Sequence, residues 1–536
     1  MRSLYTGAVL VLSLAMFVAA GMCLIPLPGL QSDEVLFGSA VYAPQTTRAW
    51  VTVFGKTLPI MLLSYLGALK TWLYAPILAE WPPSAWSIRV PVLLLGAITI
   101  WLFYRLLDRV CGRRAALLGC ALLATDTTFL LTTCFDWGPV VLQRLLAVAG
   151  VLLLVRYHQD GSRLSLASAF FLFGLALWDK ALFGWSLAGF LAGAVLVFPG
   201  AIGKAVRPWP LLLALACFCA GVFPLAWYNH RYPMETVREN VGWSTEIIGH
   251  KFTILGRTLA GSGLMGYLTY DDPADSPRRP RTGLERALVA LDELAGRPHQ
   301  GFLPYAMLGA VVAIPFCWRT RARAPVLFAL VFLTVTWGLM LFTRGGGASV
   351  HHVSLVWPWP HFLVAVAAAE LSTRFRRAGL AAVVLSGALF CGRALLVSNA
   401  NLSQLVRNGA RGSWSNAIYT TADYIESASP GEVVVLDWGL LESLQTLLRG
   451  RTKLVWGGER LRKSPSGSED EEEIRTMVEP PHRIFLSFVD SQEQYPGVNE
   501  RFRSILARIG ATREILLVIR DSNGRPVHEL SRIRLP

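Results

Sequence analysis

Two adjacent carboxylates, Asp33 and Glu34, follow the first long apolar segment of the chain. An ionisable pair at such a boundary lies where membrane gives way to water, and a carboxylate there can take a proton from a hydroxyl group. A second interpretation is that the pair caps a helix beginning near Val35, since carboxylates satisfy the free N–H groups of a helix start. The residues leave both interpretations open.

Further ionisable residues stand at the ends of apolar segments, where a buried charge is costly unless pairing or function compensates. In chain order they are Lys56, Arg89, Asp126, Asp136, Lys180, Arg344, His351 and His352. We expect all of them near the same membrane face as Asp33. Such a grouping indicates a polar cavity, although structural ion pairs would account for part of it.

Each of these residues has a structural and a functional interpretation. Asp136, together with Asp126, could orient an acceptor or a metal ion, but Asp136 precedes Pro139 and could equally cap a helix. Lys180 could bind a phosphate or pair with the neighbouring Asp179. Arg344 precedes three glycines and offers a phosphate partner on a turn.

No metal site stands out from the spacing of possible ligands. His351 and His352 are the candidates, yet two adjacent histidines on a helix point about 100° apart and do not form a chelating pair by spacing alone. The sequence identifies no cofactor, and whether the protein needs a divalent metal stays open.

The elements that must position these side chains are apolar helices. The chain has 536 residues, of which 53% are hydrophobic and only 16% charged, as in a polytopic membrane protein with a soluble part. Apolar windows of about 20 residues predict about eleven transmembrane helices. They lie near 4–27, 88–107, 115–131, 138–155, 164–179, 182–200, 209–228, 303–317, 325–342, 352–370 and 378–397.

The distribution of charge argues for membrane topology and against nucleic-acid binding. Residues 398–536 hold 18 Lys and Arg against 18 Asp and Glu, so the net charge of +14 belongs to the first 397 residues. Basic residues gather in cytoplasmic loops. The basic connections of this chain predict a cytoplasmic N-terminus, with Asp33 and the C-terminal domain on the outer side.

Three segments lie outside the predicted spans. Residues 29–88 form a first outer loop that we expect to carry amphipathic surface helices, and residues 229–302 form a large outer loop. Residues 398–536 predict an extracytoplasmic α/β domain, with buried strands near 433–436, 453–456, 483–488 and 514–519. Residues 1–397 then form the transmembrane domain.

This order of features resembles the membrane-embedded C-type glycosyltransferase (GT-C) fold, and within it glycosyltransferase family 39, the protein O-mannosyltransferase-like group. The lipid A aminoarabinose transferases are relatives. The resemblance covers most of residues 1–397 and rests on an outer loop that opens with Asp33-Glu34, an Arg-x-Pro sequence at Arg89 and a later acidic residue, Asp136.

The resemblance implies a sugar donor on a polyprenyl phosphate, an acceptor hydroxyl that approaches from outside, and inversion at the sugar carbon. It implies that Asp33, with Glu34 beside it, is the catalytic base and that Asp136 is a second acidic position. Lys56 is similar to a family lysine that contacts the donor phosphate, and His352 falls where the family often has an aromatic or basic residue. We expect Arg89, Lys180 and Arg344 to be further ligands of the phosphate.

The sequence therefore predicts a multi-pass glycosyltransferase of the inner (plasma) membrane. Its expected partners are a polyprenyl-phosphate sugar, membrane lipids and a protein, lipid or glycan acceptor, without nucleic acid. One alternative is a lipid or glycan transporter, although no internal repeat is evident and the charges gather at one face. Another alternative is a non-catalytic protein of cell-envelope assembly.

Overall fold

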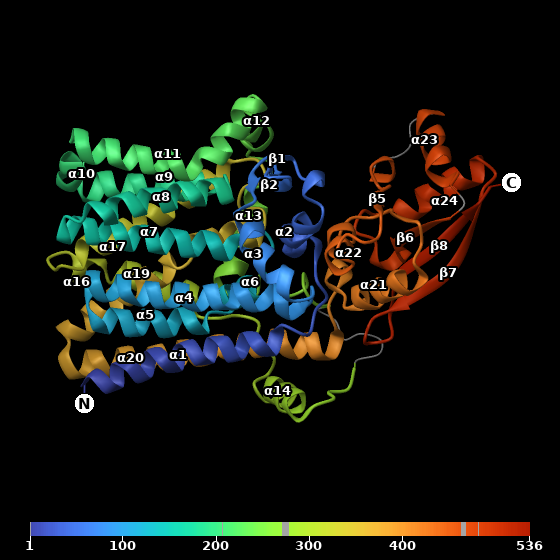
Figure 1. The fold of residues 1–536 in the computed structure, drawn as a ribbon. Coiled ribbons are helices and arrows are strands. Elements are labelled where there is room, and N and C mark those ends of the chain that lie inside the picture. Colours follow the sequence, from blue (N-terminus) through green and yellow to red (C-terminus); the bar gives the residue numbers. More distant parts are fainter. Residues whose placement is uncertain (1, 206, 271–277, 463–467, 481, 536) are drawn as a thin grey trace.

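A bundle of long helices makes up most of the molecule, with a sheet-containing C-terminal domain at one end (Figure 1). The computed structural model describes residues 2–205, 207–270, 278–462, 468–480 and 482–535. Within the described residues, the N-terminus of the chain and the C-terminal domain lie at opposite ends of the bundle.

Seven described helical runs are long and apolar enough to cross a membrane, by length and composition. They are α1 (Arg2–Leu24), α4 (Ala85–Cys111), α7 (Val140–Asp160), α11 (Pro208–Arg231), α17 (Arg323–Phe342), α20 (Arg376–Asn408) and the run Val350–Arg374, which comprises α18 (Val350–Val353), η2 (Ser354–Val356) and α19 (Trp359–Arg374). The predicted polytopic helical fold is confirmed.

The remaining apolar segments form shorter or bent helices. α5 (Arg113–Thr125) and α6 (Thr127–Cys134) meet at 58° and make an eighth span if they count as one. The others are α8 (Arg163–Asp179), α9 (Phe183–Val197), α15 (Leu303–Val312) and α16 (Ile314–Cys317). All eleven predicted segments are thus helical, although fewer than eleven described helices reach the length of a single span.

The first outer loop corrects the expectation of surface helices. Residues 49–67 form a three-stranded antiparallel sheet of β1 (Ala49–Val53), β2 (Lys56–Leu63) and β3 (Leu66–Gly67). The turn between β1 and β2 is Phe54-Gly55, whose φ angles of 49° and 75° suit a tight hairpin.

Two helices flank this sheet, α2 (Ser32–Tyr42) and α3 (Leu69–Glu80). The helix α2 does not lie on a surface, because Val35 and Phe37 are fully buried. The short helix η1 (Pro44–Thr46) joins α2 to β1.

Short helices fill the connections between the long ones. They are α10 (Pro199–Ala205), α12 (Glu235–Asn240), α13 (Ile248–Leu259) and α14 (Gly283–Leu294). The start of α14 is a capping box, in which the Thr282 side chain accepts from the Glu285 N–H and the Glu285 carboxylate accepts from the Thr282 N–H.

The C-terminal domain contains the predicted sheet, in the order β5-β4-β6-β8-β7. Its strands are β4 (Glu432–Val435), β5 (Leu454–Trp456), β6 (Arg483–Phe488), β7 (Thr512–Arg520) and β8 (Pro526–Arg534). β5, β4 and β6 are parallel, with Val434 opposite Val455 and Phe485, and β8 runs antiparallel to β6, with Leu486 opposite Leu530.

Helices cover both faces of this sheet, which explains why β4 is apolar on both sides. The helices of this part of the chain are η3 (Gly412–Trp414), α21 (Ala417–Ala428), α22 (Leu441–Leu447), η4 (Arg460–Arg462), α23 (Ser468–Val478), η5 (Asp490–Gln492) and α24 (Val498–Arg508), and those on the sheet are α21, α22, η4, α23 and α24. Val433 packs in a core with α21 and α22, whereas Val434 packs in a core with α23 and α24. The domain boundary expected at residue 397 falls inside α20, which continues to Asn408.

Candidate functional site

The Asp33-Glu34 pair lies in the first turn of α2, and the two carboxylates have different surroundings. The Gln31 side chain caps the helix by accepting from the N–H groups of Asp33 (2.7 Å) and Glu34 (3.2 Å). Glu34 is buried and binds Arg89 through both carboxylate oxygens, at 2.7 and 2.8 Å. Its side chain therefore belongs to a structural ion pair.

Arg89 is fully buried, and all five of its N–H groups are used. Besides Glu34, it donates to the carbonyl oxygens of Ile25 (2.6 Å), Pro28 (3.0 Å) and Gly29 (2.6 Å). It thus fixes the connection from α1 to α2. These contacts engage every N–H group of Arg89 within the protein, and the expected binding of donor phosphate by Arg89 stays a prediction.

Asp33 is half-buried and forms no ion pair with the described residues. Burial raises its pKa to about 6, and the charge of Glu442 adds to this rise, while a hydrogen bond from Gln31 and the charge of Lys180 oppose it. Of the two carboxylates, Asp33 is the one left for chemistry.

Lys180 lies between α8 and α9, where its backbone forms an isolated bridge with Leu66 of β3. The side chain is buried, and its ammonium group forms no ion pair with the described residues. A Cβ atom at Gly138 would lie 3.1 Å from Lys180 Nζ, so the lysine reaches across the backbone between α6 and α7. Burial lowers its pKa to about 8, partly offset by Asp136, Asp179 and Asp33.

Aromatic side chains lie near Asp33 and the connection that Lys180 contacts. Trp137 packs against Tyr267 and Trp414, with ring centroids 5.6 and 5.7 Å apart. Burial and the nearby charge of Asp33 raise the pKa values of Tyr65 and Tyr267 to about 12. Both tyrosines therefore stay neutral beside Asp33 at ordinary pH.

Asp136 has a structural environment rather than the expected acceptor or metal site. One carboxylate oxygen binds Lys70 Nζ at 2.8 Å, and the other accepts from the N–H groups of Val140 (2.9 Å) and Val141 (3.1 Å) at the start of α7. The residue is buried. The capping interpretation holds for Asp136.

Asp126 is likewise occupied. It caps α6 by accepting from the Phe129 N–H at 2.6 Å and also accepts from the Trp357 indole at 2.9 Å. His361 Nε2 lies 3.4 Å from its other oxygen. Asp126 therefore holds the bend between α5 and α6 against α19.

His351 and His352 lie on α18 with their ring centroids 4.3 Å apart. The Trp137 indole donates to His351 Nδ1, and His352 Nδ1 lies 3.1 Å from the Gly345 carbonyl oxygen. Among the described residues, no group of three His, Cys, Asp or Glu side chains could hold a metal ion. The two histidines do interact electrostatically with Lys180 and so border the site.

Arg344 and Lys56 are both exposed. The Arg344 backbone N–H donates to the Gly242 carbonyl at 2.6 Å, which joins the end of α17 to the connection after α12. Lys56 starts β2 beside the hairpin turn, and neither residue forms an ion pair with the described residues. The structure does not bring either cation into the buried cluster around Lys180.

Sequence reasoning missed Arg144 and Lys70. Arg144 is buried in α7 and donates to the Ser354 carbonyl (3.1 Å) and Thr132 Oγ1 (2.7 Å). Its position inside an apolar segment was a usable signal. Lys70 follows a short strand and gives no such signal.

Asp179 is buried, and neither carboxylate oxygen has a hydrogen-bond partner among the described residues. The expected pair between Asp179 and Lys180 does not form as a direct contact.

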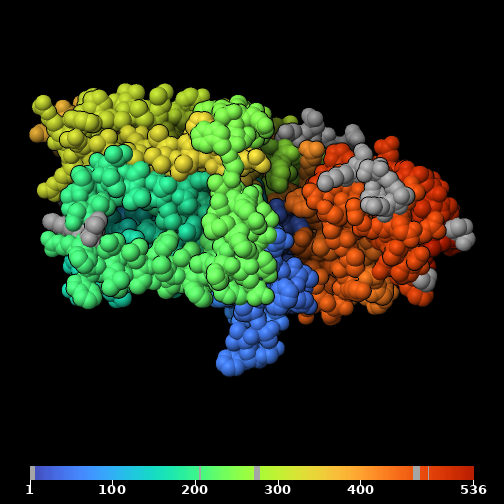
Figure 2. All heavy atoms as spheres, turned by 90° about the horizontal axis from the view of Figure 1, so that it is seen from above, coloured from blue at the N-terminus to red at the C-terminus, as the bar shows by residue number. Residues whose placement is uncertain are grey.

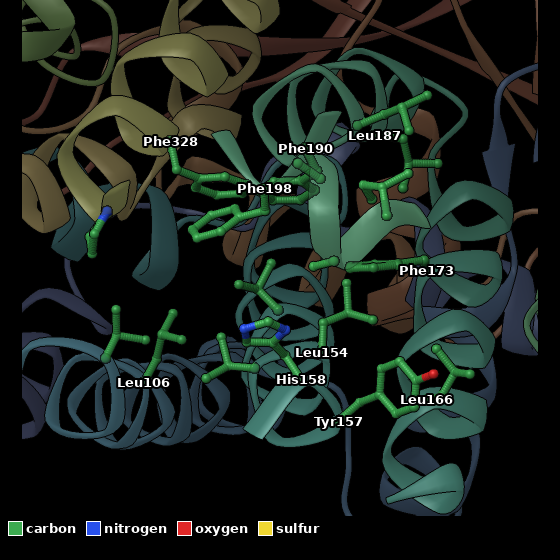
Figure 3. A pocket seen from close by; sticks show the side chains of 18 of the residues that line it. Leu106, Leu154, Tyr157, His158, Leu166, Phe173, Leu187, Phe190, Phe198 and Phe328 are labelled. Atoms are coloured by element: carbon green, nitrogen blue, oxygen red, sulfur yellow. The ribbon is translucent and has the colours of Figure 1, made fainter. Parts of the chain in front are cut away.

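An apolar cavity lies apart from the charged residues around Lys180. It has a volume of about 450 Å³ and is lined by residues of α4, α7, α8, α9, α17 and α19 (Figure 3). Figure 2 shows a hollow in the bundle, away from the C-terminal domain. Tyr157 and His158 are the polar members of its lining, so the cavity suits hydrocarbon rather than sugar or phosphate.

Comparison with protein families gives a match over part of the chain. Residues 68–228 match the model of the dolichyl-phosphate-mannose-protein mannosyltransferase family. The match includes Lys180 and begins after Asp33. No curated protein matches the sequence.

Solved structures are similar over nearly the whole chain. ArnT from Cupriavidus metallidurans bound to undecaprenyl phosphate is 13% identical, with a TM-score of 0.60, and the match covers 99% of this chain and 98% of that chain. The Archaeoglobus fulgidus oligosaccharyltransferase is 11% identical, with a TM-score of 0.55 over 91% of this chain and 70% of that chain. The mycobacterial arabinofuranosyltransferase AftD is 15% identical, with a TM-score of 0.50 over 98% of this chain and 40% of that chain.

These similarities confirm the GT-C fold predicted from the sequence. The matched family and the three structures are all glycosyltransferases, the class of enzyme that the sequence predicts.

Proposed function

We propose that this chain transfers a sugar from a polyprenyl-phosphate donor to an acceptor hydroxyl group, with Asp33 as the general base. The observation that carries the proposal is the difference between the two neighbouring carboxylates. Glu34 is bound on both oxygens by Arg89, whereas Asp33 has no ion-pair partner among the described residues and faces the same cluster as the buried Lys180.

The chemistry follows from these two groups. Asp33 takes the proton of the acceptor hydroxyl group. At the same time, the acceptor oxygen attacks the anomeric carbon of the donor sugar from the side opposite the phosphate. The bond from that carbon to the phosphate oxygen breaks, and its electron pair stays on the phosphate. Lys180 stabilises the negative charge that develops there. The products are an inverted glycoside and the polyprenyl phosphate.

The donor class is supported by the comparisons. The matched family is named for dolichyl-phosphate mannose, and the similar ArnT structure holds undecaprenyl phosphate. The acceptor is a protein, lipid or glycan hydroxyl. A structure of the similar oligosaccharyltransferase carries a tethered acceptor peptide, which supports the presence of an acceptor site in this fold.

The location of the site supports reaction at the outer face of an inner membrane. The helix α2, which carries Asp33, lies at the same end of the bundle as the C-terminal domain, whereas α10 and α16, which are followed by basic residues, lie at the other end (Figure 1). Since basic loops stay in the cytoplasm, the site end is outside.

The test is transfer by the purified protein in detergent. A panel of radiolabelled polyprenyl-phosphate sugars is incubated with cell-envelope extract as acceptor, and loss of label from the lipid is measured. Asp33→Asn should lower the rate roughly 100-fold to 10,000-fold. The matched control is Asp423→Asn, which changes an exposed carboxylate of α21 and should leave the rate unchanged.

Two outcomes would reject the proposal. Full transfer by a correctly folded Asp33→Asn protein would show that Asp33 is not the base. Binding of donors without turnover by the wild type would instead favour a transporter or an assembly protein.

A further inference from the structure

The C-terminal domain holds the start of α22 in a fixed position. The helix follows β4, at the edge of the sheet formed by the carboxyl ends of three parallel strands. Asp437, in the connection, accepts hydrogen bonds from the backbone N–H groups of Trp438 (2.7 Å), Gln494 (2.8 Å) and Tyr495 (3.1 Å). The connection after β4 is thereby tied to the one after β6.

The same helix packs against the start of α2. Ser443 Oγ donates to the Leu30 carbonyl at 2.8 Å, and Thr446 Oγ1 donates to the Val35 carbonyl at 3.4 Å. Gly38 lies under Thr446, because a Cβ atom at position 38 would be 3.3 Å from the Thr446 methyl group. These contacts join the soluble domain directly to the helix that carries Asp33.

At this interface, the Glu442 side chain of α22 contacts the first turn of α2. Ser32 Oγ donates a hydrogen bond to the carboxylate of Glu442. Ser32 is the residue before Asp33, and Glu442 interacts electrostatically with Asp33. A negative charge beside Asp33 disfavours ionisation of the Asp33 carboxyl group.

Burial is the largest cause of the raised pKa of Asp33, and the other groups around it act in both directions. Lys180, after α8, acts in the opposite direction, and Gln31 contributes a hydrogen bond. Tyr65, after β2, and Tyr267, after α13, are neutral. After burial, the charge of Glu442 is the next cause of the raised pKa of Asp33.

We propose that Glu442 is a positioning residue of the transfer reaction, a carboxylate that the C-terminal domain holds against Ser32, beside Asp33, at the start of α2. This inference rests on the proposed function of Asp33. It assigns the soluble domain a part in the chemistry, since the membrane domain alone leaves Asp33 without this neighbour.

The test is the dependence of kcat/KM on pH for the full-length protein. Glu442→Gln should move the acid limb of the profile down by roughly one pH unit, because the repulsion of the Asp33 carboxylate is removed. Glu442→Asp keeps the charge and should keep the acid limb near its wild-type position. The control is Glu500→Gln, an exposed carboxylate of α24, which should leave the profile unchanged.

The outcomes separate this inference from the proposed function. The role of Glu442 alone would be overturned if the acid limb of Glu442→Gln lay at the wild-type pH or at a higher pH while transfer still depended on Asp33. Transfer that persists in Asp33→Asn would overturn the proposed function instead. If Glu442→Gln does not fold, Glu442→Ser, with a smaller neutral side chain, should show the same downward movement.

Discussion

At the scale of single residues, the site is defined by which charges remain unpaired. Glu34, Arg89, Asp136 and Asp126 are all held in ion pairs or helix caps. Asp33 and Lys180 have no ion-pair partner among the described residues, although Lys180 is buried. A buried cation without a direct ion pair is costly, and the charges of Asp136, Asp179 and Asp33 offset only part of the cost for Lys180, so a bound anion would relieve the rest. A donor phosphate would supply that anion.

The wild-type enzyme should show a bell-shaped profile of kcat/KM against pH. Asp33 acts only as a carboxylate, and its pKa of about 6 makes activity fall as the pH drops through that value. Lys180 helps only while protonated, and its pKa of about 8 makes activity fall as the pH rises through that value. Initial transfer rates from pH 4.5 to 10 check both limbs. A profile that stays flat across neutrality would contradict these assignments.

Substitution of Lys180 should identify the alkaline limb. Lys180→Arg should keep activity at a reduced rate and lose the limb near pH 8, because a guanidinium stays charged to about pH 12 or above. Lys180→Met should lower kcat by roughly 100-fold to 1,000-fold below about pH 8, where the wild-type lysine is protonated, and by less above it. The same substitution at the exposed Lys56 should have little effect. If Lys56→Met lost more activity than Lys180→Met, Lys56 would be favoured as the lysine that contacts the donor phosphate, as the family resemblance implies.

The sequence predicts part of this site and misses the rest for a physical reason. Asp33 and Lys180 stand out because charge interrupts or follows apolar sequence. The choice between Asp33 and Glu34 depends on Arg89, which lies 55 residues further along the chain from Glu34. Glu442 is 410 residues from Ser32 and is one acid among many in a soluble domain, so no local pattern marks it.

At the scale of elements, the Glu34–Arg89 pair fixes the position of α2. Both side chains are buried and joined by two hydrogen bonds, and Arg89 also binds the connection that leads from α1. The pair therefore sets the direction in which the first turn of α2, and Asp33 with it, faces the site.

Removal of either partner should destabilise the protein strongly. Glu34→Gln or Arg89→Met leaves one buried charge without its partner, which typically costs about 3–5 kcal/mol. The double variant Glu34→Met with Arg89→Met should be more stable than Arg89→Met alone. Thermal unfolding in detergent measures this, with Glu426→Gln of the exposed Glu426–Arg451 pair as a control that changes little. Equal melting temperatures for wild type and Arg89→Met would contradict a structural role.

The hairpin of β1 and β2 shows why one element was predicted as the wrong type. Aromatic residues and single lysines between positions 50 and 70 resemble a surface helix in composition. The alternative signal was the run Val51-Thr52-Val53 before the turn Phe54-Gly55, since β-branched residues followed by a tight turn favour a hairpin. Composition alone did not separate the two structures.

At the scale of the whole molecule, the fold brings two distant parts of the chain to one end of the bundle. The C-terminal domain packs on α2 through α22, and α20 runs without a break from the membrane bundle to Asn408. This connection limits the freedom of the domain to move away from Asp33. The proposed role of Glu442 needs such a persistent contact during turnover.

A cross-link between α2 and α22 should therefore leave the enzyme active. Gly38→Cys with Thr446→Cys would place two thiols in this contact, where a Cβ atom at position 38 lies 3.3 Å from the Thr446 methyl group. We expect transfer by the oxidised double variant to equal that of the same protein after reduction, with disulfide formation checked by mass spectrometry. Each single cysteine variant controls for the substitutions and for the eight native cysteines. Loss of transfer that returns on reduction would show that the C-terminal domain must separate from α2 in each cycle, and Glu442 would then lie beside Asp33 only in the resting enzyme.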